Sequence, residues 1–204
     1  TLSGHSHYIN GPAGVDHLHR LRSIVDAVNV GAGTVRTDDP QLTVRRVSGS
    51  NPVRVVIDPG GTLGASARVF AADGTRRIAI IVQGTRLRIA NDIETIALPG
   101  SRAFLDPGAI LEALSARGLR RVLVEGGART VSHFLAAGCL DRLHVVVAPV
   151  IVGSGLPGLA LPPVDRMTDA LRVPIHAHLL GDEVLFDCDL SARRAPAGRA
   201  STST

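Results

Sequence analysis

Residues 122–131 read VLVEGGARTV, a pattern that points to one kind of fold. Three apolar residues of high strand propensity are followed by an acidic residue, two glycines and residues that can begin a helix. A second stretch of this kind, AVNVGAGT, stands at residues 27–34. A short apolar strand that ends in glycines is typical of the strand–helix–strand unit of a parallel sheet.

The apolar segments outside these two stretches fit the same sheet. Most are short continuous runs of Val, Ile and Leu, as expected for strands that are buried on both faces. Near the end of the chain the pattern changes to alternation, and Gly181-Asp182 joins two alternating segments, which predicts an antiparallel hairpin at the edge of the sheet. The further strands are expected at 53–57, 78–82, 95–98, 143–148, 173–180 and 183–190.

Three helices are expected to flank the sheet. The first covers Pro12–Ile24 with Asn10 as its N-cap, and the second begins after Asp106 and ends near Arg117. The third begins after Gly127. The expected fold class is therefore α/β, with a mainly parallel central sheet flanked by helices and a C-terminal antiparallel hairpin.

The 204 residues suffice for one domain, which we expect over residues 1–190. The chain opens on polar, turn-like residues, so a first strand is expected to be missing ahead of residue 1. Residues 191–204, SARRAPAGRASTST, are poor in apolar side chains and are expected to be a disordered tail.

Composition narrows the classes of function. No apolar run is long enough to span a membrane. The net charge is +4, and all 22 basic residues are arginine. The isoelectric point near 10.3 is therefore raised by the absence of lysine and does not indicate a basic surface. Aromatic residues make up only 2% of the chain, too few to stack on a nucleic-acid strand. We expect neither a nucleic-acid nor a membrane partner.

Cysteine and histidine spacing predicts no disulfide and no metal site. Cys139 and Cys188 lie far apart and fit free thiols, and no signal-peptide pattern opens the chain, so a cytoplasmic protein is expected. The histidine pairs lack the ligand spacings of known metal sites. These pairs are His5/His7, His17/His19 and His176/His178.

The turn after residue 124 is the strongest candidate for a binding site. Gly126 and Gly127 let a ligand approach the backbone, and the following helix would offer free N–H groups to an anion such as a cofactor pyrophosphate. A plain tight turn is the alternative. Glu125 closes a buried strand and therefore needs a partner. It would accept N–H groups of a polar heterocycle, or else cap a helix or pair with an arginine.

The glycines after the strand at 27–30 do not make a standard dinucleotide fingerprint. Gly31 and Gly33 fit its spacing, but Arg36 stands where the third glycine would be. Thr34 and Asp38 nevertheless offer a hydroxyl and a carboxylate to a ligand above the turn.

Two arginines are candidate phosphate ligands. Arg22 lies close to the apolar face of the first helix, and Arg45 follows an apolar segment. For either arginine taken alone, a surface salt bridge is the commoner explanation.

Together, two segments of the chain resemble the reductase domain of the riboflavin-biosynthesis deaminase/reductase family. They are residues 26–45, DAVNVGAGTVRTDDPQLTVR, and residues 122–131, and the resemblance extends over about residues 3–190. It implies a dihydrofolate-reductase-like fold that uses NADPH. The implied reaction is hydride transfer to C1′ of the ribosylamino group of 5-amino-6-(5-phosphoribosylamino)uracil, which gives the ribitylamino product.

The resemblance also implies roles for individual residues. Glu125 is the implied catalytic residue, which orients the pyrimidine and favours a protonated imine. The implied substrate-binding residues are Ser6, Arg22, Leu42, Arg45 and Glu125. The implied cofactor-binding residues are Tyr8, Thr34, Asp38, Gly126, Gly127, Ala128, Arg129, Thr130, Val131, Ser132 and His133.

Some features depart from the family pattern or stay open. The deaminase domain and the first strand are absent from the sequence given, Tyr8 replaces a common tryptophan, and Pro59 replaces a common small hydroxyl residue. Family members commonly form homodimers. A paralogous NADPH reductase of another pyrimidine or pterin, and a non-catalytic nucleotide-binding module, are the alternative functions. No arginine can be placed at a 2′-phosphate, so NADH also remains open.

Overall fold

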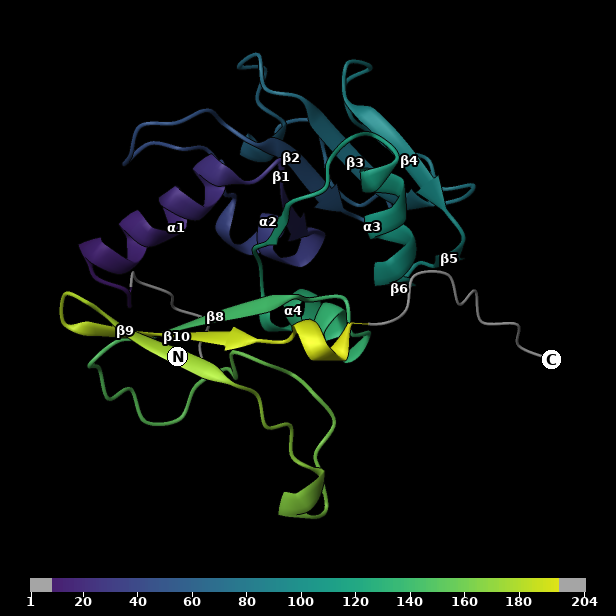
Figure 1. The fold of residues 1–204 in the computed structure, drawn as a ribbon. Helices are drawn as coiled ribbons and strands as arrows, with labels where there is room; N and C mark the ends of the chain where they lie inside the picture. The colour runs from purple at the N-terminus through teal and green to yellow at the C-terminus, as the bar shows by residue number, and fades with distance from the viewer. Residues whose placement is uncertain (1–8, 195–204) are drawn as a thin grey trace.

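The parallel sheet expected from the sequence forms the upper part of the molecule in Figure 1. In the computed structural model, which describes residues 9–194, its strands lie in the order β4-β3-β2-β1-β7, and every neighbouring pair is parallel. The mainly parallel α/β class is confirmed. The strands are β1 (Ala27–Gly31), β2 (Val53–Ile57), β3 (Arg77–Val82), β4 (Glu94–Leu98) and β7 (Val122–Val124).

Helices cover both faces of this sheet. On one face, α3 (Pro107–Ser115) and α4 (Ala128–Ala136) pack their apolar side chains, including the buried Phe134, onto the strands. On the other face, α2 (Ala32–Asp38) and a 3-10 turn, η1 (Arg68–Phe70), enclose a second apolar cluster. The central strands β1, β2 and β3 are therefore buried on both sides, which explains their largely apolar runs.

Of the two N-caps expected from the sequence, Asp106 is observed and Asn10 is not. α1 (Pro12–Ile24) has the expected bounds, but its N-cap is Gly11 and not Asn10, whose amide donates instead to Glu183 Oε1 at 2.9 Å. The expectation for Asn10 is therefore wrong, because the N-cap position falls one residue later, on Gly11. Asp106 caps α3 as expected and accepts from Ala109 N at 2.9 Å.

The glycine turn expected after β1 is in fact the start of helix α2. Gly31 has an extended backbone and serves as the N-cap, so no tight turn forms there. Val35 is 2% exposed and anchors the helix in the core. The helix ends at Asp39, whose φ of 37° is left-handed and whose N–H bonds to Val35 O.

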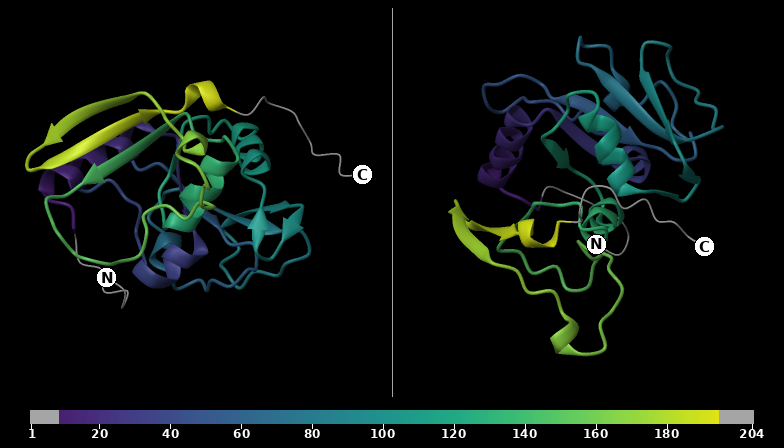
Figure 2. Two further views of the ribbon diagram at one scale, coloured as in Figure 1. Left: turned by 90° about the horizontal axis from the view of Figure 1, so that it is seen from below. Right: turned by 45° about the vertical axis from the view of Figure 1, so that its right-hand side comes forward.

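The C-terminal hairpin belongs to a separate antiparallel sheet of order β8-β10-β9. These strands are β8 (Arg142–Val147), β9 (Ile175–Leu180) and β10 (Glu183–Asp189). The hairpin is therefore not at the edge of the parallel sheet, since β10 pairs with β8 and not with a parallel strand. Figure 2 shows this sheet from two further sides, apart from the parallel one.

Shorter elements complete the described chain. Residues 191–193 form a 3-10 turn in which Ser191 bonds to Asp189, so the expected tail does not begin at residue 191, while residues 195–204 lie outside the described part. No helix of the described residues is both long and apolar enough to cross a membrane. The remaining elements are β5 (Gly100–Ser101), β6 (Phe104–Leu105), η2 (Met167–Asp169) and η3 (Ser191–Arg193).

A buried carboxylate joins α1 to the second sheet. Glu183, at the start of β10, is 2% exposed and accepts from Gly14 N at 2.9 Å as well as from Asn10. A Cβ on Gly14 would lie 2.4 Å from Glu183 Oε2, so only glycine allows this approach. α1 is thereby held over the space between the two sheets.

Asn29 in β1 is expected to weaken the fold. It is 0% exposed on the α3–α4 face, and neither of its amide atoms has a hydrogen-bond partner in the described residues. Because burial without partners costs free energy, Asn29→Val should raise the free energy of unfolding by about 1–3 kcal/mol in urea melts. Asn51→Val is the matched control and should destabilise, since Asn51 accepts from Val44 N at 2.7 Å. Equal or lower stability of the Asn29 variant would contradict the argument.

Candidate active site

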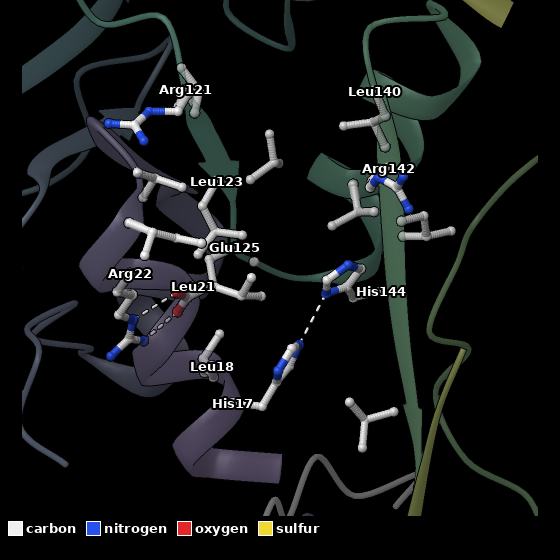
Figure 3. A pocket seen from close by; sticks show the side chains of 18 of the residues that line it. His17, Leu18, Leu21, Arg22, Arg121, Leu123, Glu125, Leu140, Arg142 and His144 are labelled. Atoms are coloured by element: carbon white, nitrogen blue, oxygen red, sulfur yellow. Dashed lines mark hydrogen bonds and ion pairs between the residues drawn. The ribbon is translucent and has the colours of Figure 1, made fainter. Parts of the chain in front are cut away.

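A cavity of about 1990 Å³ lies between α1, β7 and β8. Figure 3 shows side chains of all three elements pointing into it. Its floor is largely apolar, and its charged lining includes Arg22, Arg45 and Glu125. Three residues that the sequence singled out from separate segments therefore share one cavity.

The centre of this site is an ion pair between α1 and the end of β7. Arg22 Nε donates to Glu125 Oε1 at 2.7 Å, and its Nη2 donates to Glu125 Oε2 (Figure 3). The two side chains are only 8% and 17% exposed. Arg22 Nη1 also donates to Thr43 O at 3.0 Å. Glu125 is thus held in a fixed orientation. Of the partners that the sequence left open for this carboxylate, the structure shows an arginine.

The second candidate arginine lies close to the first. Arg45 is exposed, and its Nη1 donates to Thr43 Oγ1 at 3.2 Å and to Gln41 Oε1 at 2.7 Å. Thr43 therefore contacts both arginines, one through its carbonyl and the other through its hydroxyl. Of the two guanidinium groups, that of Arg45 is the one open to solvent and able to meet a phosphate.

Leu42 has an unusual backbone. Its φ is 56°, in the left-handed region, while its side chain is 2% exposed in the core. A non-glycine residue adopts this conformation only where packing enforces it, and such residues gather at functional sites. The buried side chain holds the backbone that carries Thr43 into the site.

The two glycine-containing strand ends are in direct contact. Gly127 N donates to Thr34 Oγ1 at 2.8 Å, which joins the start of α4 to α2. Asp38 lies four residues after Thr34 on the same helix, hence on the same side of it, and is exposed. The two stretches therefore lie side by side at the carboxyl ends of β1 and β7.

The start of α4 offers free donors beside this contact. Thr130 N and Val131 N both bond to Gly127 O, and no described residue bonds to the N–H groups of Ala128 and Arg129. Two free N–H groups at a helix N-terminus suit an anion.

The later residues of α4 point elsewhere. Ser132 is 2% exposed, and its Oγ accepts from Ala160 N at 2.7 Å. The ring of His133 packs edge-on against Phe104 with a centroid distance of 5.5 Å. Residues 126–133 were all expected to face the cofactor. Residues 126–129 are therefore better placed to contact it than Ser132 and His133. Ser6 and Tyr8 lie outside the described residues.

Two residues of the site were not expected from the sequence. Thr43 acts through its backbone carbonyl, which no side-chain pattern reveals. His19 is 2% exposed, and its Nδ1 accepts from Arg45 N at 3.1 Å. Its only sequence signal was a position on α1 one turn ahead of Arg22.

His19 should make stability fall in mildly acidic solution. Burial, followed by the charges of Arg22 and Arg45, lowers the pKa of His19. The unfolded chain therefore binds a proton near pH 6.5 that the folded chain resists, and stability is lost as pH falls from there through the lowered pKa. We expect His19→Asn, whose Oδ1 can replace Nδ1 as acceptor, to reduce the drop in Tm between pH 7.5 and 5.5 by about 2–4 °C. An unchanged drop would exclude this role.

Two strand edges face the cavity without a partner strand. Among the described residues β7 pairs only with β1, and β8 only with β10. Because Glu125 N donates to Asn29 O, alternation turns the backbone groups of Val122 and Val124 away from β1. Leu190 N donates to Asp141 O, so by the same rule His144 and its alternate neighbours turn theirs away from β10.

The chain is similar to known proteins of one family. The model of the RibD C-terminal domain family matches residues 1–173. The chain is 33% identical to the 2,5-diamino-6-ribosylamino-4(3H)-pyrimidinone 5′-phosphate reductase of Methanothermobacter thermautotrophicus, over 92% of this chain and 89% of that protein. It is 34% identical to the riboflavin biosynthesis protein RibD of Mycobacterium tuberculosis, over 83% of this chain and 43% of that one.

Solved structures show the same relationship. A diaminohydroxyphosphoribosylaminopyrimidine deaminase/5-amino-6-(5-phosphoribosylamino)uracil reductase of Thermotoga maritima is similar with a TM-score of 0.72 and 30% identity, over 85% of this chain and 47% of that chain. RibD of Acinetobacter baumannii has a TM-score of 0.79 and 25% identity, over 93% and 53%. The chain spans about half the length of these RibD proteins. The expected dihydrofolate-reductase-like fold is confirmed. Because the family model matches residues 1–173 of the 204, this chain belongs to the RibD C-terminal domain family.

Proposed function

We propose that the protein is an NADPH-dependent reductase of riboflavin biosynthesis that reduces the ribosylamino group of 5-amino-6-(5-phosphoribosylamino)uracil to a ribitylamino group. The observation that carries the proposal is the Arg22–Glu125 pair, which holds a carboxylate at the carboxyl end of β7 beside the exposed Arg45. A carboxylate for the pyrimidine and a guanidinium for the phosphate are what such a substrate needs. Relatives named as reductases of closely related compounds support it.

The residues at the α2–α4 contact fit a dinucleotide cofactor. A Cβ on Gly127 would lie 3.2 Å from Thr34 Oγ1, so the bare glycine leaves the backbone open to a pyrophosphate. The free N–H groups of Ala128 and Arg129 would hold that pyrophosphate, with Thr34 and Asp38 beside it. When bound, the reduced nicotinamide would supply a hydride.

The chain's own residues then orient the substrate and favour positive charge at the reacting carbon. Glu125 accepts N–H groups of the pyrimidine edge with whatever lone pairs Arg22 leaves free, and its negative charge favours the protonated imine at C1′. Arg45 holds the phosphate. This role demands alignment and electrostatics more than nucleophilic chemistry.

A second substrate has a specific observation in its favour. The chain covers 89% of a relative named for the 2,5-diamino-pyrimidinone, the compound with an amino group where the uracil has a carbonyl. Both compounds carry the same ribosylamino phosphate, so the same residues would hold either.

A spectrophotometric assay tests the proposal and its alternatives. The purified chain is mixed with NADPH or NADH and with the aminouracil phosphate, the diaminopyrimidinone phosphate or a dihydropterin, and loss of the reduced-nicotinamide absorbance is followed. Turnover with the aminouracil supports the proposal, and faster turnover with the diaminopyrimidinone replaces its substrate. Turnover with only the pterin would identify a paralogous reductase, and cofactor binding without turnover a nucleotide-binding module.

We further propose that the expected first strand lies between β7 and β8 in the complete site. The cavity there is about twice the size of ordinary ligand pockets, so a strand that pairs with the two facing edges would still leave room for the substrate beside α1. Hydrogen exchange of the Val124 and His144 amides tests this. Fast exchange in this chain that becomes slow when an apolar strand is fused ahead of residue 1 supports the proposal, and unchanged exchange overturns it.

A homodimer is also part of the proposal. The outer face of the second sheet carries exposed apolar side chains on β8 and β9, the strands on either side of β10, among them Val147 at 49%, Ile175 at 51% and Leu179 at 80% exposure. Such a contiguous apolar face suits a second copy of the chain. Light scattering should show a dimer that Leu179→Glu converts to a monomer. A monomeric parent protein would refute it.

A further inference from the structure

A row of polar side chains runs from the second sheet to α1 beside the substrate cavity. His17 Nε2 lies 3.0 Å from His144 Nδ1, with the rings stacked (Figure 3). His144 Nε2 lies 3.4 Å from Asp187 Oδ1, an oxygen that is buried and has no hydrogen-bond partner among the described residues. Asp187 Oδ2 accepts from Arg142 at 2.7 Å. The proposed function so far gives this row no task.

The carboxylate at one end determines where the protons lie. A neutral His144 with its proton on Nε2 points a positive dipole at Asp187, whereas the other tautomer would point a lone pair at it. The Nε2–H tautomer leaves Nδ1 of His144 as an acceptor, so His17 must donate through its own Nε2. Nδ1 of His17, to which no described residue bonds, is then the atom that accepts or releases a proton.

The proposed reaction needs a proton donor. Opening the ribosylamine breaks the C1′–O4′ bond, and the electron pair moves to O4′, which must take a proton. The acidic side chains lining the cavity are paired with arginines: Glu125 with Arg22, Asp187 with Arg142, and Asp141 with Arg194 at 3.6 Å. His19 uses its Nδ1 to accept from Arg45 N.

We propose that His17 is the general acid of the reductase, with His144 and Asp187 as the residues that position it. This inference rests on the proposed function. His17 Nδ1 delivers its proton to O4′ as the C1′–O4′ bond breaks, C1′ receives the hydride of the reduced nicotinamide, and neutral His17 takes a proton back from water. His17 lines the same cavity as Arg22 and Glu125, one helical turn and a little more along α1.

The charges around His17 set the direction of its pH dependence. Burial, followed by the charges of His144, Arg20 and His178, lowers the pKa of His17, and Asp187 raises it in part. Because the acid must carry its proton, kcat/KM should fall as pH rises through this lowered pKa. The charged and titratable groups facing the row are Arg20 on α1, Arg142 on β8, His176 and His178 on β9, and Asp187 on β10.

Kinetics of three variants test the assignment. His17→Gln should lose about 100-fold in kcat and also the fall of kcat/KM with pH. Asp187→Asn should keep that fall but move it to lower pH, since the charge that raises the pKa of His17 is gone. His176→Gln is the control. It removes an exposed histidine that lies across from Asp187 on β9, whereas His144 lies on β8, and it should leave the profile unchanged. A His17→Gln enzyme with the parent's pH profile overturns the proposal.

Nitrogen NMR of the ligand-free chain tests the proton positions without any turnover. We expect His144 to carry its proton on Nε2 and acidification to protonate Nδ1 of His17. A proton on Nδ1 of His144 would overturn the assignment even in an active enzyme. If neither the parent chain nor the chain with the fused strand turns over any of the substrates, the proposed function fails, whereas an active enzyme with an indifferent His17 variant refutes only the acid.

Discussion

Glu125→Gln should lower kcat about 100-fold or more and leave the affinity for NADPH within about threefold. The amide has nearly the shape of the carboxylate and can still accept from Arg22, so the fold of the site survives. What is lost is the negative charge that favours a protonated imine. Stopped-flow turnover and fluorescence titration of the cofactor measure the two quantities separately.

Glu94→Gln is the matched control for this prediction. Glu94 also binds arginines through both oxygens, with Arg76 at 2.7 Å and Arg117 at 2.6 Å, but it lies on β4, outside the cavity lining. It should leave turnover unchanged. If both variants are equally active, Glu125 has only a structural role. If the Glu125 variant loses cofactor affinity as strongly as turnover, the carboxylate acts on the cofactor and not on the substrate.

Gly127→Asp should weaken binding of NADPH at least about tenfold while the fold becomes no less stable. Gly127 is the N-cap of α4, its φ of −59° suits any residue, and no side chain caps the helix there. A Cβ would lie 3.2 Å from Thr34 Oγ1, at the end of a short side chain that can shift slightly. Aspartate is a favoured N-cap and would satisfy the free N–H groups itself. It would also place a negative charge where the pyrophosphate is proposed to bind.

Gly127→Asn separates charge from size in this experiment. Asparagine has nearly the same volume as aspartate and caps helices equally well, but it is neutral. Calorimetry should therefore show a clearly smaller loss of affinity for Asn than for Asp, at similar Tm. Equal losses would mean that the side chain only fills space beside Thr34, and no loss in either variant would move the cofactor away from α4.

Local patterns in the sequence predicted most elements of the fold. Pro12–Ile24 and Val53–Ile57 have the bounds expected from helical spacing and from a continuous apolar run. Asp106 caps its helix because capping depends on a few neighbouring residues. The helix after Gly31 was missed, since its glycines are equally common in turns.

Contacts between distant segments could not be predicted in this way. Asn10 does not cap the helix beside it, and its amide donates instead to Glu183, 173 residues away. The hairpin joined β8 in a second sheet, because strand pairing depends on which edges meet in space. The row from His17 to Asp187 likewise comes from three elements, and the spacing of its residues along the chain carries no trace of it.

Residue identity alone determined which groups this protein has for chemistry: a carboxylate and two glycines at the end of an apolar strand, two arginines, and a loop that resembles one family. Only the tertiary structure decided how they are used, by pairing Glu125 with Arg22 and leaving Arg45 exposed. The physical reason is that local structure depends on backbone preferences and nearby hydrogen bonds, which neighbouring residues specify. The state of a charged group depends instead on the partners and the burial that the folded chain brings to it.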